Sequence, residues 1–276
     1  MALELAAAHN GEIINTDSMQ VYGVLQLLTA RPSPAEMEGI AHHLYGHVEP
    51  GSDYSTGVWL ADAERAVADV QARGKLPVLV GGTGLYFRAI TGGLSDMPVV
   101  PAEMRALWRA RLEEDGVESL HAELTRRDPA MGARLKVADR QRILRALEVV
   151  DATGQSILTY QGKGGPAVID PDRAARIVIL PDRAVLNARI SDRFASMVAK
   201  GAMEEVRQLL ALGLADSSPA MKAIGVSQLS QVIDGRMSEA EAIEKASIAT
   251  RQYAKRQMTW FRNQLDGGWI ARDSVT

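Results

Sequence analysis

The sequence of 276 residues contains no cysteine, which excludes disulfide bonds and any thiolate metal site. It has no apolar run of transmembrane length, and no basic region followed by an apolar stretch at its N-terminus, as a signal peptide would have. The formal net charge is only −3, so any binding of nucleic acid has to come from local clusters of basic residues. We therefore expect a cytoplasmic protein without a membrane partner.

Helix and strand patterns alternate along the first part of the chain. Residues 2–9 are rich in the helix formers Ala and Leu, with Gly11 placed as a left-handed C-cap, and residues 12–16 then predict a short strand. Residues 61–73 predict an amphipathic helix, and the continuous apolar run over 76–80 predicts a parallel strand buried on both faces. This alternation indicates an α/β fold with a parallel sheet.

Each of these two strands ends in residues that suit a ligand site. Gly81-Gly82-Thr83-Gly84 follows the second strand and leads into a helix, where glycines let backbone N–H groups approach an anion. A tight structural turn is the alternative explanation of this short motif. Asp17 follows the first strand and suits a hydrogen-bond acceptor or general base, although a helix N-cap or a structural turn would also explain it.

A helical segment interrupts the alternation between about 101 and 165. Its patterns predict helices over 101–115, 117–127 and 139–153, bounded by MPVVP and GKGGP, and no strand. The core then resumes with an apolar strand over 176–180, helices over 183–200, 202–212 and 239–264, and a short last strand at 269–270. We predict a core of residues 1–98 and 168–276 with an inserted helical domain, 99–167.

Basic residues gather in two places. Residues 126–145 contain seven Lys and Arg against two Asp, and residues 245–262 contain five Lys and Arg without an acid. In the second stretch, helical spacing puts Arg251, Lys255 and Arg262 on one side of a helix and aromatic residues on a neighbouring side. This pattern suits phosphate contacts and base stacking, and a solvated helix with its aromatic residues in the core is the alternative.

Three histidines, His42, His43 and His47, raise the question of a metal site, since His43 and His47 are four residues apart. Because no third ligand is evident, packing near the sheet is the simpler interpretation.

Read together, these segments resemble the bacterial tRNA dimethylallyltransferases, also called tRNA isopentenyltransferases. The matching stretches follow the order of the family and cover nearly the whole chain: DSMQVY (17–22), LTARPSP (28–34), HHLYGHV (42–48), LVGGTGLY (79–86), RRDP (126–129), DRQRILRALEV (139–149), RF (193–194), KAIG (222–225) and TRQYAKRQMTWFR (250–262). The resemblance implies a P-loop NTPase-like core with a helical insertion that contacts tRNA. It also implies transfer of a dimethylallyl group from dimethylallyl diphosphate to N6 of the adenosine just 3′ of the anticodon.

The resemblance further implies a Mg²⁺ cofactor and the tRNA anticodon stem-loop as partner, and we expect a monomer. Family members begin with a strand and a phosphate-binding loop of the GPTASGKS type, and no G-x-x-x-x-G-K-[ST] motif occurs in this sequence. We therefore expect the core to lack its first strand and Walker A loop, which would have supplied most of the diphosphate contacts and the metal-binding hydroxyl. The alternatives are a catalytically impaired, tRNA-binding remnant and, from the fold alone, a P-loop small-molecule kinase.

The resemblance assigns three catalytic residues. Asp17 is the general base, with Ser18, Met19 and Gln20 along the path of the adenosine. Thr83, beside Gly82, offers a hydroxyl near the bridging oxygen of the diphosphate. Arg193 neutralises the leaving group, and a surface ion pair of Arg193 with Asp192 or Glu204 is the alternative.

Ten matched positions outside this centre are implied to contact the tRNA, which must flip its target base into a channel. They lie in the insertion and in the last long helix: Arg105, Gln141, Arg142, Ile143, Leu144, Arg145, Arg251, Lys255, Arg256 and Gln257. One departure from the family is Val226-Ser227, where members often carry an aromatic and a basic residue, so no RNA contact is assigned to that segment.

Overall fold

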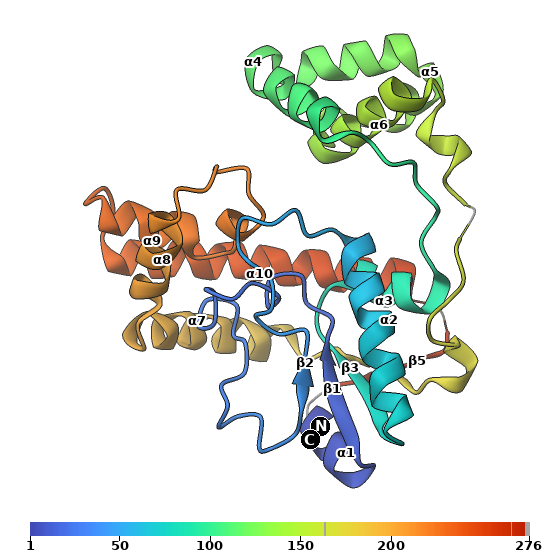
Figure 1. Cartoon of the computed structure of the whole chain (residues 1–276). Helices are drawn as coiled ribbons and strands as arrows, with labels where there is room; N and C mark the ends of the chain where they lie inside the picture. Colours follow the sequence, from blue (N-terminus) through green and yellow to red (C-terminus); the bar gives the residue numbers. More distant parts are fainter. Residues whose placement is uncertain (163, 266, 274–276) are drawn as a thin grey trace. The chain divides into compact units, whose positions relative to one another are not determined.

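The computed structural model describes residues 1–162, 164–265 and 267–273 (Figure 1). Two compact units divide the chain. Met1–Thr91 and Val168–Thr276 form the first, here called the α/β unit, and Gly92–Ala167 form the second, the helical unit. Each unit has a hydrophobic core of its own.

A parallel three-stranded sheet in the order β2-β1-β3 organises the first part of the α/β unit. Helix α1 (Ala2–Ala8) leads into β1 (Gly11–Asn15), which pairs with β2 (His42–His43) and β3 (Leu76–Val80). The predicted cap at Gly11 is wrong, because Asn10 takes the left-handed conformation at φ 49°. Gly11 is required for a different reason, since a Cβ there would lie 2.9 Å from the carbonyl oxygen of Leu76.

Helix α2 (Thr56–Ala72) begins five residues before its predicted start. Ser55 explains the difference, because its side chain accepts a hydrogen bond from the backbone N–H of Val58 and caps the helix. From the first turn of α2, Trp59 donates its indole N–H to the carbonyl oxygen of Asn15 at 3.1 Å and stacks on Tyr86. Tyr86 belongs to α3 (Gly84–Gly92), so these contacts tie α2 and α3 to the end of β1.

A second, two-stranded parallel sheet joins β4 (Arg176–Ile179) to β5 (Trp269–Arg272), which confirms the short last strand. The other helices of this unit are α7 (Arg183–Ala199), α8 (Ala202–Ala211), α9 (Val226–Ile233) and α10 (Glu239–Gln264). Among these, α9 had no counterpart in the sequence-based prediction. Short 3₁₀ turns occupy Ile157–Thr159, Pro171–Arg173 and Ala220–Lys222.

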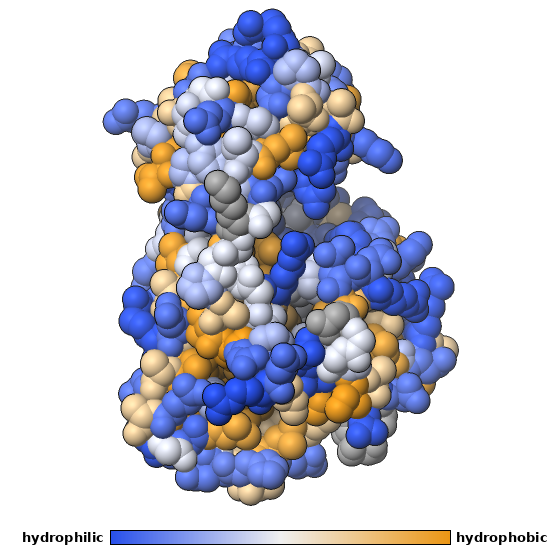
Figure 2. Space-filling model, turned by 90° about the vertical axis from the view of Figure 1, so that its right-hand side faces the viewer, coloured by the Kyte–Doolittle hydropathy of each residue, from blue (hydrophilic) through white to orange (hydrophobic). Residues whose placement is uncertain are grey.

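The predicted burial of the second strand on both faces is wrong. Every residue of β3 is at least partly accessible, and Leu76 is 45% exposed. Within the described residues β3 pairs with β1 alone and β4 with β5 alone, so both are edge strands. Apolar side chains accordingly reach the molecular surface. Figure 2 shows hydrophobic residues on one face of the molecule in orange.

The helical unit contains α4 (Ala102–Arg127), α5 (Pro129–Arg134) and α6 (Arg140–Thr153). Gly116 interrupts α4 with a non-helical φ of 79° and ψ of 167°, so the two helices predicted over 101–115 and 117–127 are confirmed. Gly154 ends α6 in the left-handed conformation, as a C-cap glycine does. None of the helices in the described part of the chain is long and apolar enough to cross a membrane.

Candidate active site

Asp17 follows directly on β1 and is held there by a buried neighbour. The side chain of Asn15 accepts the backbone N–H of Asp17 at 2.8 Å and donates to the carbonyl oxygens of Asp17 and Leu44, each at 3.0 Å. Asn15 is fully buried, and a buried amide must find partners in this way. Asn15 was not predicted as a site residue, although a polar residue at the end of a buried strand was a signal for it in the sequence.

The two carboxylate oxygens of Asp17 have different surroundings. Oδ1 accepts the backbone N–H groups of Met19 at 2.8 Å and Gln20 at 3.3 Å. Oδ2 has no hydrogen-bond partner among the described residues, so it is open to a donor on a substrate. Burial raises the pKa of Asp17, and the two backbone hydrogen bonds oppose this only in part.

The Gly81–Gly84 turn meets the Asp17 segment through hydroxyl groups. Thr83 Oγ1 accepts the backbone N–H of Ser18 at 3.0 Å and donates to Ser18 Oγ at 3.2 Å, and the N–H of Thr83 reaches the carbonyl oxygen of Thr16 at 3.2 Å. A Cβ at Gly81 would overlap Thr16, so the close approach of the two segments requires glycine. The structure thus brings Asp17, Ser18 and Thr83 together.

Helix α10 packs on the other side of the same turn. Gln257 donates its amide to the carbonyl oxygen of Gly82 at 2.9 Å, and the ring of Trp260 fills the space where Gly84 would carry a Cβ. A Cβ at Gly82 would lie 3.5 Å from Asp17 Oδ2. Gln257, which the resemblance assigned to the tRNA, therefore uses its amide nitrogen to anchor α10 beside Asp17.

Three tyrosines surround Asp17 and were not predicted as site residues. Burial, and after it the Asp17 charge, raises the pKa of Tyr45 to about 12. Burial is also the main cause of the raised pKa of Tyr86 and Tyr253, to which the Asp17 charge contributes. All three stay protonated near neutral pH, and they lie in a loop, in α3 and in α10, which no local sequence motif connects.

Gln20 and Met19 have structural contacts as well. The amide of Gln20 donates to the carbonyl oxygens of Thr29 at 2.9 Å and Ala30 at 3.0 Å, and Met19 packs against the hydrophobic core. Both residues therefore shape the segment that carries Asp17.

Arg193 lies on α7, where partial burial of its guanidinium group lowers its pKa and the charge of Glu36 opposes this shift. The ion pair with Asp192 or Glu204 does not form within the described residues, since Glu204 pairs with Arg207 at 3.4 Å. No hydrogen bond of the described residues links Arg193 to Asp17 or Thr83, so its predicted catalytic role stays a prediction.

The basic side of α10 confirms the predicted helical arrangement. Arg251, Lys255 and Arg262 line one hollow of about 420 Å³, together with Arg183 of α7. Arg251 donates to Ser191 Oγ at 3.2 Å, and the four cations form no ion pair with any described residue. Arg256 lines an adjoining hollow of about 550 Å³ and lies 5.7 Å above the ring centre of Tyr253.

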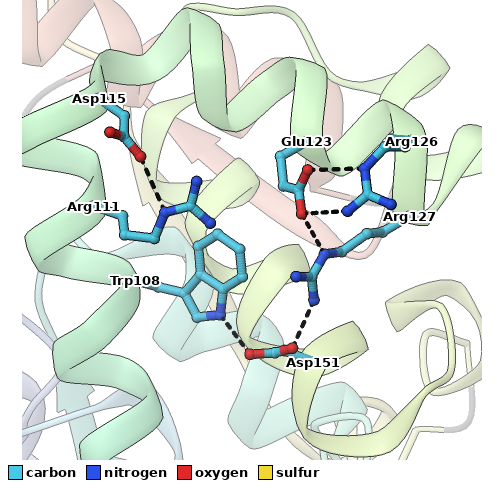
Figure 3. A network of polar contacts seen from close by, with 7 residues as sticks. All are labelled: Trp108, Arg111, Asp115, Glu123, Arg126, Arg127 and Asp151. Atoms are coloured by element: carbon cyan, nitrogen blue, oxygen red, sulfur yellow. Dashed lines mark hydrogen bonds and ion pairs between the residues drawn. The ribbon is translucent and has the colours of Figure 1, made fainter.

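The basic run of the helical unit is largely neutralised inside that unit. Arg126 and Arg127 both bind Glu123, and Arg127 also binds Asp151 at 2.6 Å (Figure 3). Asp151 in turn accepts the indole N–H of the buried Trp108 at 3.1 Å. Arg126 and Arg127 therefore serve the fold, whereas Arg134, Lys136 and Arg142 are exposed and form no ion pair within the described residues.

Two of the residues that the resemblance assigned to the tRNA have buried side chains, and their role in binding tRNA stays a prediction. Ile143 is 0% and Leu144 6% exposed, and both belong to the core of the helical unit, because they face inward on α6. Their neighbours Gln141 and Arg142 are exposed. Arg145 points toward Glu148 at 3.4 Å and the carbonyl oxygen of Pro98 at 3.5 Å, and Arg105 is half-buried on α4.

The histidines have protein partners. His43 lies 2.6 Å from Glu12, and His47 lies 3.2 Å from the hydroxyl of Tyr54. In residues 1–162, 164–265 and 267–273, no group of three or more His, Cys, Asp or Glu side chains could hold a metal ion.

A parallel α/β core, with an open carboxylate oxygen beside a glycine-rich turn, is typical of α/β proteins that bind their ligands at the carboxyl ends of strands. Comparison with known proteins makes this specific, since the model of the IPP transferase family matches residues 20–264. The chain belongs to the IPP transferase family.

The chain is similar to known proteins over nearly its whole length. The tRNA dimethylallyltransferases of Rhizobium meliloti (strain 1021) and Agrobacterium fabrum (strain C58) are each 58% identical over 269 residues, which is 98% of this chain and 89% and 90% of theirs. Among solved structures, a tRNA isopentenylpyrophosphate transferase of Staphylococcus epidermidis matches with a TM-score of 0.66 and 32% identity, over 98% of this chain and 87% of its own. A eukaryotic dimethylallyltransferase acting on tRNA matches with a TM-score of 0.82 and 25% identity, over 99% of this chain and 69% of its own. These matches confirm the predicted P-loop NTPase-like fold.

Proposed function

We propose that the chain transfers a dimethylallyl group from dimethylallyl diphosphate to N6 of the adenosine 3′-adjacent to the anticodon in tRNA. The family membership and the names of its relatives support the reaction class. The observation that carries the proposal is the open Oδ2 of Asp17 beside the Ser18–Thr83 hydroxyl pair. No observation favours the impaired remnant or the small-molecule kinase.

Asp17 acts as the acceptor for the adenine amino group. The lone pair of N6 is delocalised into the ring, so N6 becomes a useful nucleophile only as it loses a proton. Oδ2 accepts the N6–H hydrogen bond while the bond from N6 to the allylic carbon forms. The bond from that carbon to oxygen breaks, its electron pair leaves with the diphosphate, and the N6 proton passes to Asp17.

The Ser18–Thr83 pair serves the leaving group. Because Thr83 donates to Ser18, the hydroxyl proton of Ser18 stays available for an oxygen of the diphosphate. Gly82 leaves the approach beside Asp17 unobstructed, because any side chain at this position would point toward Oδ2 and Gln257. Arg193 supplies positive charge to the diphosphate from α7.

The cations of α10 and α7 bind the RNA backbone. Arg183, Arg251, Lys255 and Arg262 surround one hollow that no carboxylate of the described residues lines, an arrangement that suits phosphate groups. Arg256 and Trp260 line the neighbouring hollow, where an aromatic ring and a guanidinium can stack on a base. In the helical unit, Gln141, Arg142, Arg134 and Lys136 supply the exposed polar surface for the same partner.

Magnesium, which the resemblance implies, does not fit a dedicated site of these residues. Asp17 is a single carboxylate beside two hydroxyls, and the described residues offer no cluster of ligands. No step of the mechanism is therefore routed through the ion.

The direct test supplies the chain with isotopically labelled dimethylallyl diphosphate and two tRNA transcripts, one with adenosine and one with guanosine 3′ of the anticodon. We expect label on N6 of the adenosine after digestion to nucleosides, and none in the guanosine transcript. Binding of the tRNA without transfer would identify the impaired remnant, and label on a small molecule instead of tRNA would identify a prenyltransferase with a different acceptor. Either result would overturn the proposal.

A further inference from the structure

Glu205, in the first turn of α8, holds the backbone of a distant loop. Its Oε1 accepts the N–H groups of Gln26 at 3.0 Å and Leu27 at 2.6 Å, and its Oε2 accepts the N–H of Leu28 at 3.1 Å. Three consecutive backbone donors on one carboxylate form strong, charge-assisted hydrogen bonds. The loop conformation around residues 26–28 therefore depends on this one side chain.

The residues that follow this loop hold Gln20. The carbonyl oxygens of Thr29 and Ala30 accept both N–H bonds of the Gln20 amide, at 2.9 and 3.0 Å. Ala30 has a φ of 54°, a left-handed conformation that a residue with a Cβ adopts only when its surroundings impose it. The segment is thus held in an unfavourable conformation that aims two carbonyl groups at one side chain.

Gln20 in turn belongs to the turn around Asp17. Its backbone N–H donates to Asp17 Oδ1 at 3.3 Å, next to the N–H of Met19 at 2.8 Å. These two bonds fix the rotation of the carboxylate and leave Oδ2 open. A path of hydrogen bonds and covalent chain therefore runs from Glu205 through residues 26–30 and Gln20 to Asp17.

From this geometry we propose that Glu205 is a positioning residue for the acceptor carboxylate of Asp17. It touches no reacting atom and acts through Gln20. The proposal deepens the reaction proposed above and rests on it only in giving Asp17 the acceptor role. Misplacement of a catalytic group by a fraction of an ångström slows the chemical step more than it weakens binding.

Helix-dipole chemistry alone would not single out Glu205. Glu204 and Glu205 both lie in the first turn of α8, where carboxylates are favoured. Glu204 is exposed and pairs only with Arg207, whereas Glu205 binds the three backbone groups. The two neighbours thus form a matched pair, and Glu204→Gln is the control for Glu205→Gln.

The first measurement is amide hydrogen exchange on the full chain, which needs no activity. In Glu205→Gln, an N–H of the new amide faces backbone donors, and we expect exchange about 5–10-fold faster at residues 26–28, as the loss of about 1 kcal/mol implies. Faster exchange should reach Met19 and Gln20, whose N–H groups bind Asp17. Glu204→Gln should leave both segments unchanged. Faster exchange confined to residues 26–28 would overturn the proposal, because Glu205 would then anchor its loop alone.

The second measurement is single-turnover prenyl transfer combined with tRNA affinity. Glu205→Gln should lower the rate about tenfold at unchanged tRNA affinity, and the addition of Gln20→Ala should lower it little further, since both act along one path. Equal losses of rate and affinity, or full additivity with Gln20→Ala, would contradict the proposal. A chain that transfers nothing would refute the proposed function, while the exchange result still decides the role of Glu205.

Discussion

Asp17 combines a partly buried carboxyl group with one oxygen that has no hydrogen-bond partner among the described residues, and this combination has a pH signature. Burial raises its pKa, so the carboxylate form needed to accept the N6 proton is lost at a higher pH than for an ordinary aspartate. We expect the single-turnover rate to fall as the pH drops through this raised pKa. The decrease should therefore occur at a pH above about 4, the ordinary pKa of an aspartate. Substrates are kept at saturating concentration at each pH, so that the pH–rate profile reports the chemical step and not substrate binding. A rate that stays constant down to pH 4, in a chain that remains folded, would contradict the assignment.

Sequence patterns could predict Asp17, Ser18 and Thr83 as one site, because each follows a strand and parallel strands end at a common edge. They could not predict Tyr45, Tyr253 or Glu205. These residues come from loops and helices that are distant from the Asp17 segment in the sequence. Local periodicity does not indicate which distant residues become neighbours in the fold. The burial of Ile143 and Leu144 was missed for a similar reason, since a motif reports which residues recur together but not which side of a helix faces the core.

At the scale of elements, one buried carboxylate ties the three strands together. Glu12 of β1 is 4% exposed and binds Lys75 at 2.7 Å, and His43 and Arg73 each at 2.6 Å. The hydrogen bond from Lys75, followed by those from His43 and Arg73, lowers the pKa of Glu12 to about 2, against the opposing effect of desolvation.

Glu12→Gln should therefore destabilise the protein by about 1–3 kcal/mol at pH 7, the usual value for hydrogen bonds to a charged group, because the side chains of Arg73 and Lys75 remain 39% and 35% exposed to solvent. The folded-state pKa is depressed, so this stabilisation is present above about pH 4.5 and disappears as the pH falls toward 2. Denaturant unfolding of both proteins at pH 7, 4 and 3 should show a shrinking difference. The exposed Glu64, which has no partner among the described residues, provides the control Glu64→Gln. A difference that does not vary with pH would exclude the ionic explanation.

Helix α10 makes the second prediction at this scale. Arg251→Ala combined with Lys255→Ala should weaken tRNA binding and reduce the slope of log affinity against log salt by roughly one to two units, since each phosphate contact contributes about one. Arg126→Ala is the control, because Glu123 already neutralises that cation. Filter binding over a salt series measures both slopes. If the control lowers the slope as much as the double variant, the basic side of α10 is not the RNA surface.

Element burial was harder to predict than element type. The apolar runs of β3 and β4 are continuous, which a strand covered on both faces would also show. Both strands instead lie at sheet edges within the described residues and stay half-exposed. Apolar content tells which residues favour burial, whereas the number of neighbours a strand finds depends on the whole chain.

At the scale of the whole molecule, two hydrophobic cores share no residue. Leu209 belongs to the core of the α/β unit and Leu120 to that of the helical unit, and both are fully buried. Leu209→Ala and Leu120→Ala should each cost about 2–5 kcal/mol. Without shared partners the two losses should add within about 0.5 kcal/mol in the double variant. Chemical denaturation of the four proteins measures this, and a coupling energy above about 1 kcal/mol would show that the cores are not independent.

The most direct test of the account compares Asp17→Asn with the parent chain in single-turnover transfer of the dimethylallyl group to tRNA, with tRNA affinity measured on the same samples. Asn keeps the size of the side chain but cannot take the N6 proton, so the rate should fall about 10²–10⁴-fold while the affinity stays within about twofold. Asp216→Asn, at an exposed position, should behave like the parent. A rate for Asp17→Asn within a few-fold of the parent would contradict the role of Asp17 and the mechanism built on it.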